Sequence, residues 1–237
     1  MQRKRFLLLL VLGVLATMSS QAQPEAGTFS IIPRFGVSLS NITNESLGIA
    51  ANSAGIDYSL DSKYREGALG GVDVQYQANN ILALSAGLSY SRLGCKYEDS
   101  DITGFQPGEY NVYSNCRISI DYLNLPLLAH VYIANGFSVN AGVQVGYKVH
   151  SNMHTESTKV TINKNGSYNY ADVPQKDDKE YIYINRFDFA IPVGISYEYA
   201  NVVLDLRYNI GITKVFDLAG HGENRSITFS VGYKLNL

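Results

Sequence analysis

The chain has 237 residues, of which 46% are hydrophobic and 17% charged, and its formal net charge is −2. A mildly acidic chain without a basic patch argues against a nucleic acid as partner, and the length suits one all-β domain. Past the N-terminal region, no apolar run approaches the length of a membrane-spanning helix. A chain of this kind that crosses a membrane must do so as a closed barrel of strands.

Residues 1–22 predict a secretory signal peptide. Arg3-Lys4-Arg5 forms a basic start, Phe6 to Leu15 is an apolar run too short to span a bilayer comfortably, and Ser20-Gln21-Ala22 is a small-x-small cleavage site. Cleavage there removes three of the 19 basic residues and none of the 21 acidic ones, for a net charge of −5 on residues 23–237. A retained membrane anchor is the alternative.

Eight segments of the mature chain alternate apolar with polar or small residues, which is typical of strands with two different faces. The clearest is the fifth, in which every odd position is apolar and every even position is polar or glycine. In chain order the predicted strands are Phe29–Leu39, Ala68–Tyr76, Leu82–Tyr90, Arg117–Ile133, Phe137–Val149, Ile184–Tyr199, Val202–Thr213 and Ser226–Leu237.

The fourth predicted strand contains an irregularity. Its apolar parity switches around Tyr122 to Leu123, which predicts a β-bulge. Pro126 has no backbone donor for a sheet ladder and fits an irregularity nearby.

Short and long connections alternate strictly along the chain. The short ones fall at Asn79-Asn80, Asn135-Gly136 and Ala200-Asn201, and Asn-Gly is a strong hairpin signal. The long, polar ones are Ile42–Glu66, Glu98–Asn115, Ser151–Tyr183 and Lys214–Arg225. Outer-membrane barrels have short periplasmic turns and long outer loops. The chain therefore predicts an all-β, eight-stranded antiparallel up-and-down transmembrane β-barrel in the outer membrane.

The composition of the two strand faces indicates which one meets lipid. Eight strands offer about forty apolar side chains. The interior of an eight-stranded barrel is only just wide enough for its own side chains, so this many apolar groups do not fit inside. We therefore predict that they form an outward band against outer-membrane lipid. The other face is rich in glycine and serine and carries charges of both signs, which must pair in a partly dry lumen. A soluble barrel with the apolar face inside is the alternative.

The inward charges form a predicted lumen network, in which Arg186 and Asp188 are expected near Asp205 and Arg207 across a short turn. The full candidate set is Arg34, Asp73, Lys148, Arg186, Asp188, Glu198, Asp205, Arg207 and Lys234.

Several motifs carry a resemblance to a known family. Asp121–Leu128 is close to its Y-L-x-I-P-L-L stretch, Asp205–Gly211 to its D-x-R-Y-x-x-G-L strand, and Phe229–Leu235 to its terminal F-x-L-G-Y-x-F. In these motifs the chain resembles the outer-membrane β-barrel domain common in Bacteroidetes, the porin-family or PorT-like proteins. The resemblance covers essentially the whole mature chain. It implies a barrel, insertion by the barrel-assembly machinery, and a PorT-like accessory role in export or gliding as one version of the function.

We expect a structural or interaction role, with the lumen plugged by side chains and with loops Ile42–Glu66 and Ser151–Tyr183 contacting a surface ligand or partner protein. A narrow passive channel for small solutes is one alternative. The second alternative is a lipid-modifying enzyme that uses His150 at the outer rim, but no spacing around the four histidines supports a catalytic group. We therefore expect no enzyme activity and no cofactor.

Two further features lie in the predicted loops. Asp99-Ser100-Asp101 resembles the start of a calcium loop, but Tyr110 stands where the closing glutamate belongs, so no metal site is expected. Cys95 and Cys116 flank one loop of an exported chain, which leaves a disulfide between them open.

Overall fold

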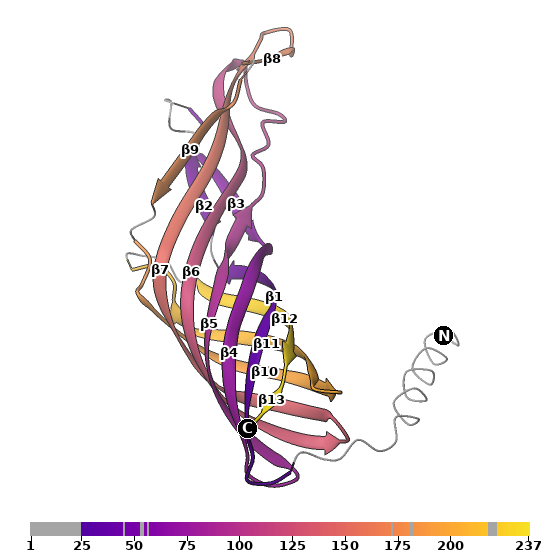
Figure 1. The fold of residues 1–237 in the computed structure, drawn as a ribbon. Coiled ribbons are helices and arrows are strands. Elements are labelled where there is room, and N and C mark those ends of the chain that lie inside the picture. Colours follow the sequence, from indigo (N-terminus) through magenta and orange to yellow (C-terminus); the bar gives the residue numbers. More distant parts are fainter. Residues whose placement is uncertain are drawn as a thin grey trace, which may run out of the picture.

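A computed structural model describes residues 25–44, 46–52, 55, 57–171, 173–180, 183–217 and 222–237. The regular structure in this part of the chain consists of thirteen β-strands (Figure 1). No helix among the described residues is long and apolar enough to cross a membrane. The predicted signal peptide, residues 1–22, and His221 lie outside the described residues.

Eight of the strands form a closed antiparallel ring, as the sequence predicts. Each pairs with the next along the chain, and β12 closes the ring against β1. The barrel strands are β1 (Phe29–Thr43), β4 (Arg65–Gln77), β5 (Leu82–Tyr97), β6 (Gly108–Ala134), β7 (Phe137–Ile162), β10 (Phe187–Tyr199), β11 (Val202–Lys214) and β12 (Glu223–Tyr233).

The outer surface of the barrel is apolar and its interior is polar. Outward side chains such as Phe35 and Phe229 are 71% and 46% exposed, whereas Asp73 on the inner face is 1% exposed. This arrangement is the reverse of a soluble barrel. The orientation predicted from the bulk of the apolar face is therefore the one that the structure has.

The irregularity predicted near Tyr122 is present, but its extra residue lies on β7 and not on β6: Asp121 pairs with His150 and Tyr122 with Lys148, which leaves Val149 of β7 without an opposite residue on β6. The pairing of β6 with β7 shifts register between Asp121 and Tyr122. Below this point Leu123 and Leu125 face outward, and above it Ile120 is fully buried. The even-numbered residues of β6 face inward on both sides of this point, so the switch in apolar parity reflects a change in the lining of the interior, from polar below to the apolar cluster above.

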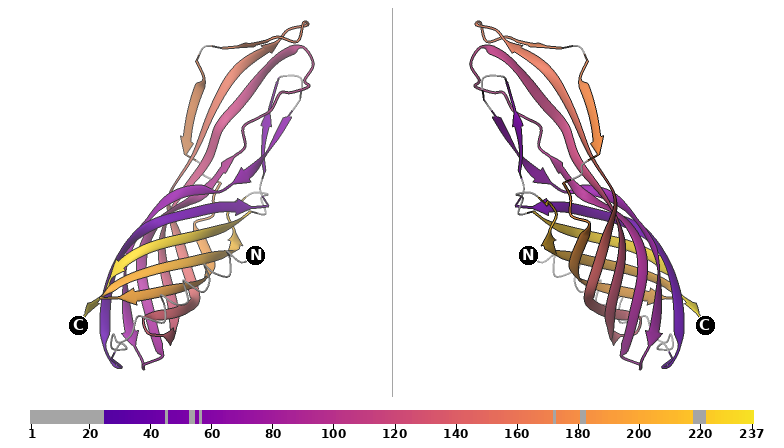
Figure 2. Two further views of the ribbon diagram at one scale, coloured as in Figure 1. Left: turned by 90° about the vertical axis from the view of Figure 1, so that its right-hand side faces the viewer. Right: turned by 90° about the vertical axis from the view of Figure 1, so that its left-hand side faces the viewer.

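Tight turns join the strands at one end of the barrel, and the C-terminus lies at the same end (Figure 2). At the turn between β6 and β7, Gly136 has φ of 70°. At the turn between β10 and β11, Ala200 and Asn201 have φ of 47° and 69°. Two consecutive residues with positive φ are typical of the two-residue hairpin turn that matches strand twist.

The opposite end carries a sheet extension, formed by segments that the sequence predicts only as long, polar connections. β6 and β7 continue as a tall hairpin far beyond the other barrel strands (Figure 1). On one side, β2 (Ser46–Ala50) pairs with β3 (Asp57–Lys63), which pairs with β5. On the other side, β8 (Tyr168–Tyr170) and β9 (Gln175–Glu180) both pair with β7. Two of the predicted loops, Ile42–Glu66 and Ser151–Tyr183, therefore consist largely of strands.

An apolar cluster explains why these segments are ordered. It joins the extension to the outer part of the barrel interior and includes Ile42, Tyr58, Leu60, Leu93, Tyr97, Tyr110, Ile118, Val160, Val215 and Phe216. Each fully buried side chain of this kind stabilises the fold by roughly 1.5–3 kcal/mol. Burying several of them stabilises strands in segments whose polar composition predicts loops.

Two strand ends also differ from prediction. The sixth predicted strand begins at Phe187 instead of Ile184, which makes only an isolated bridge to Phe216. The last strand is interrupted at Lys234, between β12 and β13 (Leu235–Asn236), where the lysine side chain points inward to an ion pair.

Candidate functional site

The centre of the lumen holds four ion-paired side chains from three strands. Arg34 on β1 forms an ion pair with Asp73 on β4, and its other terminal nitrogen lies 3.6 Å from an Asp205 carboxylate oxygen on β11. Arg207 Nε lies 2.7 Å from Asp205 Oδ1, and its terminal nitrogen lies 3.8 Å from Asp73 Oδ2. Two guanidiniums and two carboxylates thus form a neutral cluster. Neutrality matters because an unpaired charge in a desolvated lumen costs several kcal/mol.

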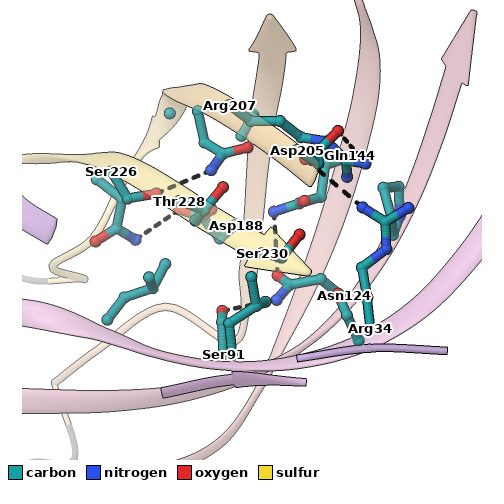
Figure 3. A pocket seen from close by; sticks show the side chains of 18 of the residues that line it. Arg34, Ser91, Asn124, Gln144, Asp188, Asp205, Arg207, Ser226, Thr228 and Ser230 are labelled. Carbon is teal, nitrogen blue, oxygen red and sulfur yellow. Dashed lines mark hydrogen bonds and ion pairs between the residues drawn. The ribbon is translucent and has the colours of Figure 1, made fainter. Parts of the chain in front are cut away.

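Uncharged side chains complete the shell around Asp205. Ser196 on β10 donates a 2.7 Å hydrogen bond to Asp205 Oδ2, and the Asn140 amide on β7 donates to the Ser196 hydroxyl at 2.8 Å. Hydrogen bonds to a carboxylate are roughly twice as strong as those between neutral groups. These contacts hold the Asp205 carboxylate beside the two arginines; Figure 3 shows Asp205, Arg207 and Arg34 in the pocket.

Polar side chains also bridge the opposite wall of the lumen. The Gln144 side chain on β7 donates to Asn124 Oδ1 at 3.2 Å, and Asn124 Nδ2 donates to the Ser91 hydroxyl at 2.8 Å (Figure 3). The cavity that remains between this wall and the four charged groups has a volume of about 30 Å³. That is room for one or a few waters.

A second ion pair lies nearer the end with the tight turns. Lys234 Nζ is 2.9 Å from Glu198 Oε2, and the lysine side chain is 3% exposed. Tyr132 donates to the same carboxylate oxygen at 3.5 Å and accepts from Gln75 at 3.0 Å. The adjacent cavity has a volume of about 10 Å³. This end of the lumen is therefore also filled with paired side chains.

Of the nine charged residues proposed for the network, seven point into the lumen. Lys148 and Arg186 do not, which corrects the prediction. The Lys148 ammonium donates to the carbonyl of Ile184 at 2.9 Å at the outer rim, and Arg186 is exposed there. Arg186 precedes the first residue of β10, and Lys148 on β7 lies opposite it, so both lie just beyond the ladder between β7 and β10.

Asp188 lines the same cavity as Asp205 and Arg207 but is not paired with either. It accepts a 2.8 Å hydrogen bond from the Asn224 amide on β12. Sequence reasoning omitted the amides of Asn124, Asn140 and Asn224 and the buried His130, which lies 2.9 Å from the Ser85 hydroxyl. Each of these four residues occupies an inward-facing position in the alternation of its strand, and this position could have identified it as a lumen residue.

The apolar cluster closes the outer end of the lumen above this polar network. Tyr122, Ile118 and Ile120 from β6 are each no more than 1% exposed, and Val215 and Phe216 pack in the same cluster. The lumen thus consists of a polar, ion-paired zone followed by an apolar zone. A hydrated ion could pass through either zone only by losing its hydration shell.

The remaining candidate groups do not assemble into a reactive site. His150 is exposed, and its strand partner is Asp121, whose carboxylate is held by Arg92 at 2.7 and 3.0 Å. The residues that resemble a calcium loop form a turn, in which Asp101 accepts hydrogen bonds from the Thr103 amide and hydroxyl at 2.8 and 2.6 Å. The described residues contain no group of three or more His, Cys, Asp or Glu side chains that could hold a metal.

Both cysteines are buried in the apolar cluster, and the structure does not join them in a disulfide. Burial raises the pKa of the Cys116 thiol above its ordinary value. The same site is therefore unfavourable for the reactive thiolate.

The family model that describes the outer membrane protein beta-barrel domain matches residues 21–217. The chain belongs to the outer membrane protein β-barrel domain family. This protein resides in the outer membrane, and its apolar outer face contacts lipid. The match ends before β12, so the closure of the barrel by β12 and β1 comes from the structure itself.

Several solved outer-membrane structures are similar to this barrel. Ail, the attachment invasion locus protein of Yersinia pestis, is 12% identical, with 89% of this chain and 99% of that chain covered and a TM-score of 0.41. Neisserial surface protein A is 14% identical, with coverage of 88% and 97% and a TM-score of 0.39. OprG from Pseudomonas aeruginosa is 13% identical, with coverage of 92% and 99% and a TM-score of 0.38. A search of curated protein sequences finds no match.

Proposed function

We propose that this protein is a closed-lumen anchor in the outer membrane that presents its sheet extension outside the cell to a ligand or partner protein. The observation that carries the proposal is the filling of the lumen by paired side chains. The cavities within the polar zone measure only about 30 and 10 Å³. Eight-stranded barrels have interiors just wide enough for their own side chains. These features favour a plugged lumen over a passive channel.

The extension supplies the contact surface. Tyr168 and Tyr170 of β8 are 43% and 60% exposed, and Val173 is 75% exposed. β8 lies at the top of the extension, at the greatest reach from the barrel (Figure 1). Tyrosine is enriched at protein interfaces because it buries a large area and keeps a polar tip. The segments predicted as contact loops, Ile42–Glu66 and Ser151–Tyr183, provide much of this surface.

Sheet edges offer a second mode of contact. β2 stands at one end of the strand order, and β8 and β9 are short strands on the other side of the extension. Backbone groups at an edge can pair with an added strand from a partner. Many of the side chains of β9 are charged, which discourages uncontrolled pairing with other edges.

We propose no enzymatic role. The buried pair His130 and Ser85 has a base within hydrogen-bond distance of a hydroxyl. However, it lies beneath cavities too small for a substrate, and the exposed His150 faces a carboxylate that Arg92 already holds. A PorT-like accessory role in export or gliding, implied by the motifs around Asp121–Leu128, is compatible with an anchor of this kind.

Planar-bilayer recordings test the plugged lumen. We expect insertion of the folded barrel without a steady current, because each zone of the lumen excludes hydrated ions. Heat-modified gel mobility of the recovered protein verifies that it remained folded. A reproducible ohmic conductance would instead favour the narrow channel.

Site-specific photo-cross-linking on intact cells tests the contact surface. A photoreactive residue at Tyr170 should form an adduct with a macromolecule. The same residue at Leu206, on the lipid face of β11, serves as the matched control and should form no such adduct. Equal adduct patterns from the two positions, or none from Tyr170, would contradict the proposed role of the extension.

A further inference from the structure

A cleft opens at the outer rim of the barrel, beside the extension. It has a volume of about 950 Å³ and is lined by the middle of β7, the ends of β9 and β11, the start of β10 and the segment that leads into β10. Three of its lining residues are basic, namely Lys148, Arg186 and Lys214. This size is typical of a pocket for a small ligand.

The three cations are available to a ligand. Lys148 uses one donor on the carbonyl of Ile184 at 2.9 Å, which fixes its ammonium at the cleft wall and leaves two donors. Arg186 and Lys214 have exposed side chains. The ion pairs found among the described residues use other cations.

Two carboxylates, Glu180 and Asp217, line the same cleft, so its formal charge is +1. The cleft therefore keeps a net attraction for anions. Its guanidinium can bind a phosphate through two parallel hydrogen bonds, and its ammonium groups contribute as point charges.

The position of the cleft specifies the source of the anion. Tyr147 and Phe187 form its lipid side, with an edge-to-face ring contact at a centroid distance of 5.5 Å. Both rings face outward and are about half exposed. Aromatic side chains at the end of a lipid-facing band lie at the level of the headgroups. Lys148 and Arg186 directly adjoin these two residues in the chain, and Lys214 lines the same cleft. The cations therefore lie near the level at which a lipid carries its phosphate.

We propose that this cleft binds the phosphate-bearing headgroup of an outer-leaflet lipid. Lys148, Arg186 and Lys214 contact the phosphate, and the rings of Tyr147 and Phe187 pack against the upper part of the acyl chains. The site is separate from the lumen and from the tip of the extension, so it does not depend on the proposed function.

Native mass spectrometry with phosphatidic acid as the probe tests the site. The intact barrel should bind one phosphatidic acid at least about tenfold more tightly than phosphatidylcholine. Each cation near a membrane surface contributes about 1 kcal/mol, which corresponds to about fivefold in affinity. Arg186→Gln and Lys214→Gln should therefore each lose about fivefold, and the triple variant with Lys148→Gln should lose the preference for phosphatidic acid.

The matched control removes the same charge from the extension through Lys63→Gln, Lys164→Gln and Lys179→Gln, and it should bind like the unaltered protein. Arg186→Lys should keep most of the affinity because it keeps the charge. Equal binding of phosphatidic acid by the cleft variant and the control would overturn the proposal. Full competition by excess inorganic phosphate would overturn the lipid as the source and assign the cleft to a soluble anion.

Discussion

Replacing Asp73 by asparagine removes one of the two carboxylates that neutralise two buried arginines. Asp73 is 1% exposed and lies against Arg34, with Arg207 at 3.8 Å. In Asp73→Asn, two guanidiniums share Asp205 alone, which leaves a net positive charge in the lumen. Breaking a buried ion pair from one side costs about 3–5 kcal/mol. We expect a loss of that size in the free energy of unfolding.

The double variant separates lost pairing from lost packing. Arg34→Gln alone leaves a net negative charge and should also lose about 3–5 kcal/mol. Combined with Asp73→Asn it restores neutrality, so the double variant should lose about as much as one single variant. The resulting coupling energy should equal the loss of one single variant, about 3–5 kcal/mol, at or above the upper end for residues in direct contact.

Urea unfolding in phospholipid vesicles, followed by far-UV circular dichroism and gel mobility, measures these free energies. The control is Lys63→Gln, which removes an exposed ion pair with Glu98 at 2.8 Å and should change stability by less than about 1 kcal/mol. A loss below about 1 kcal/mol for Asp73→Asn, or a double variant equal to the sum of the singles, would refute the reasoning.

Three further predictions concern the turns and the extension. Ala200→Asn should raise the free energy of unfolding by about 0.5–1 kcal/mol in the same assay, because asparagine tolerates the positive φ that strains alanine. The hydrogen bond from Asn115 lowers the pKa of Glu156, and the same carboxylate lies 3.6 Å from the Lys176 ammonium on β9. The contribution of this ion pair to holding β9 is therefore present above the ordinary glutamate pKa and lost as pH falls through the lowered value. Hydrogen-exchange protection of β9 should fall there, and Glu156→Gln should abolish the change. A maleimide should label Cys95 and Cys116 only after unfolding, since both are buried. Labelling of the folded protein would contradict their burial, and no labelling in denaturant would contradict the thiol form.

The ring of strands could be predicted from the sequence because its signals are local. The alternation in Phe137–Val149 and the parity switch at Tyr122 each follow from neighbouring residues, and the structure contains the strand and a register shift at the switch, although the extra residue lies on β7 and not on β6. The apolar and polar faces follow from the same alternation.

The contacts within the lumen could not be predicted in this way. Alternation identifies Arg34 as inward, but the stagger of the strands decides that it meets Asp73 on β4 and Asp205 on β11. Sequence proximity suggested Arg186 as a partner of Asp205, yet Arg186 lies beyond the start of β10. The extension was also missed because apolar residues such as Tyr58 and Val160 are spread over segments far apart in sequence.

The contact between the outer face and acyl chains can be measured directly, because the chain contains no tryptophan. A single tryptophan introduced by Phe229→Trp on β12 reports on the lipid face, and one introduced by Tyr170→Trp reports on the tip of the extension. In vesicles of lipids with brominated acyl chains, fluorescence from position 229 should be strongly quenched and fluorescence from position 170 unaffected. Quenching at position 229 by aqueous acrylamide, without quenching by the brominated chains, would contradict the assignment of this face to lipid.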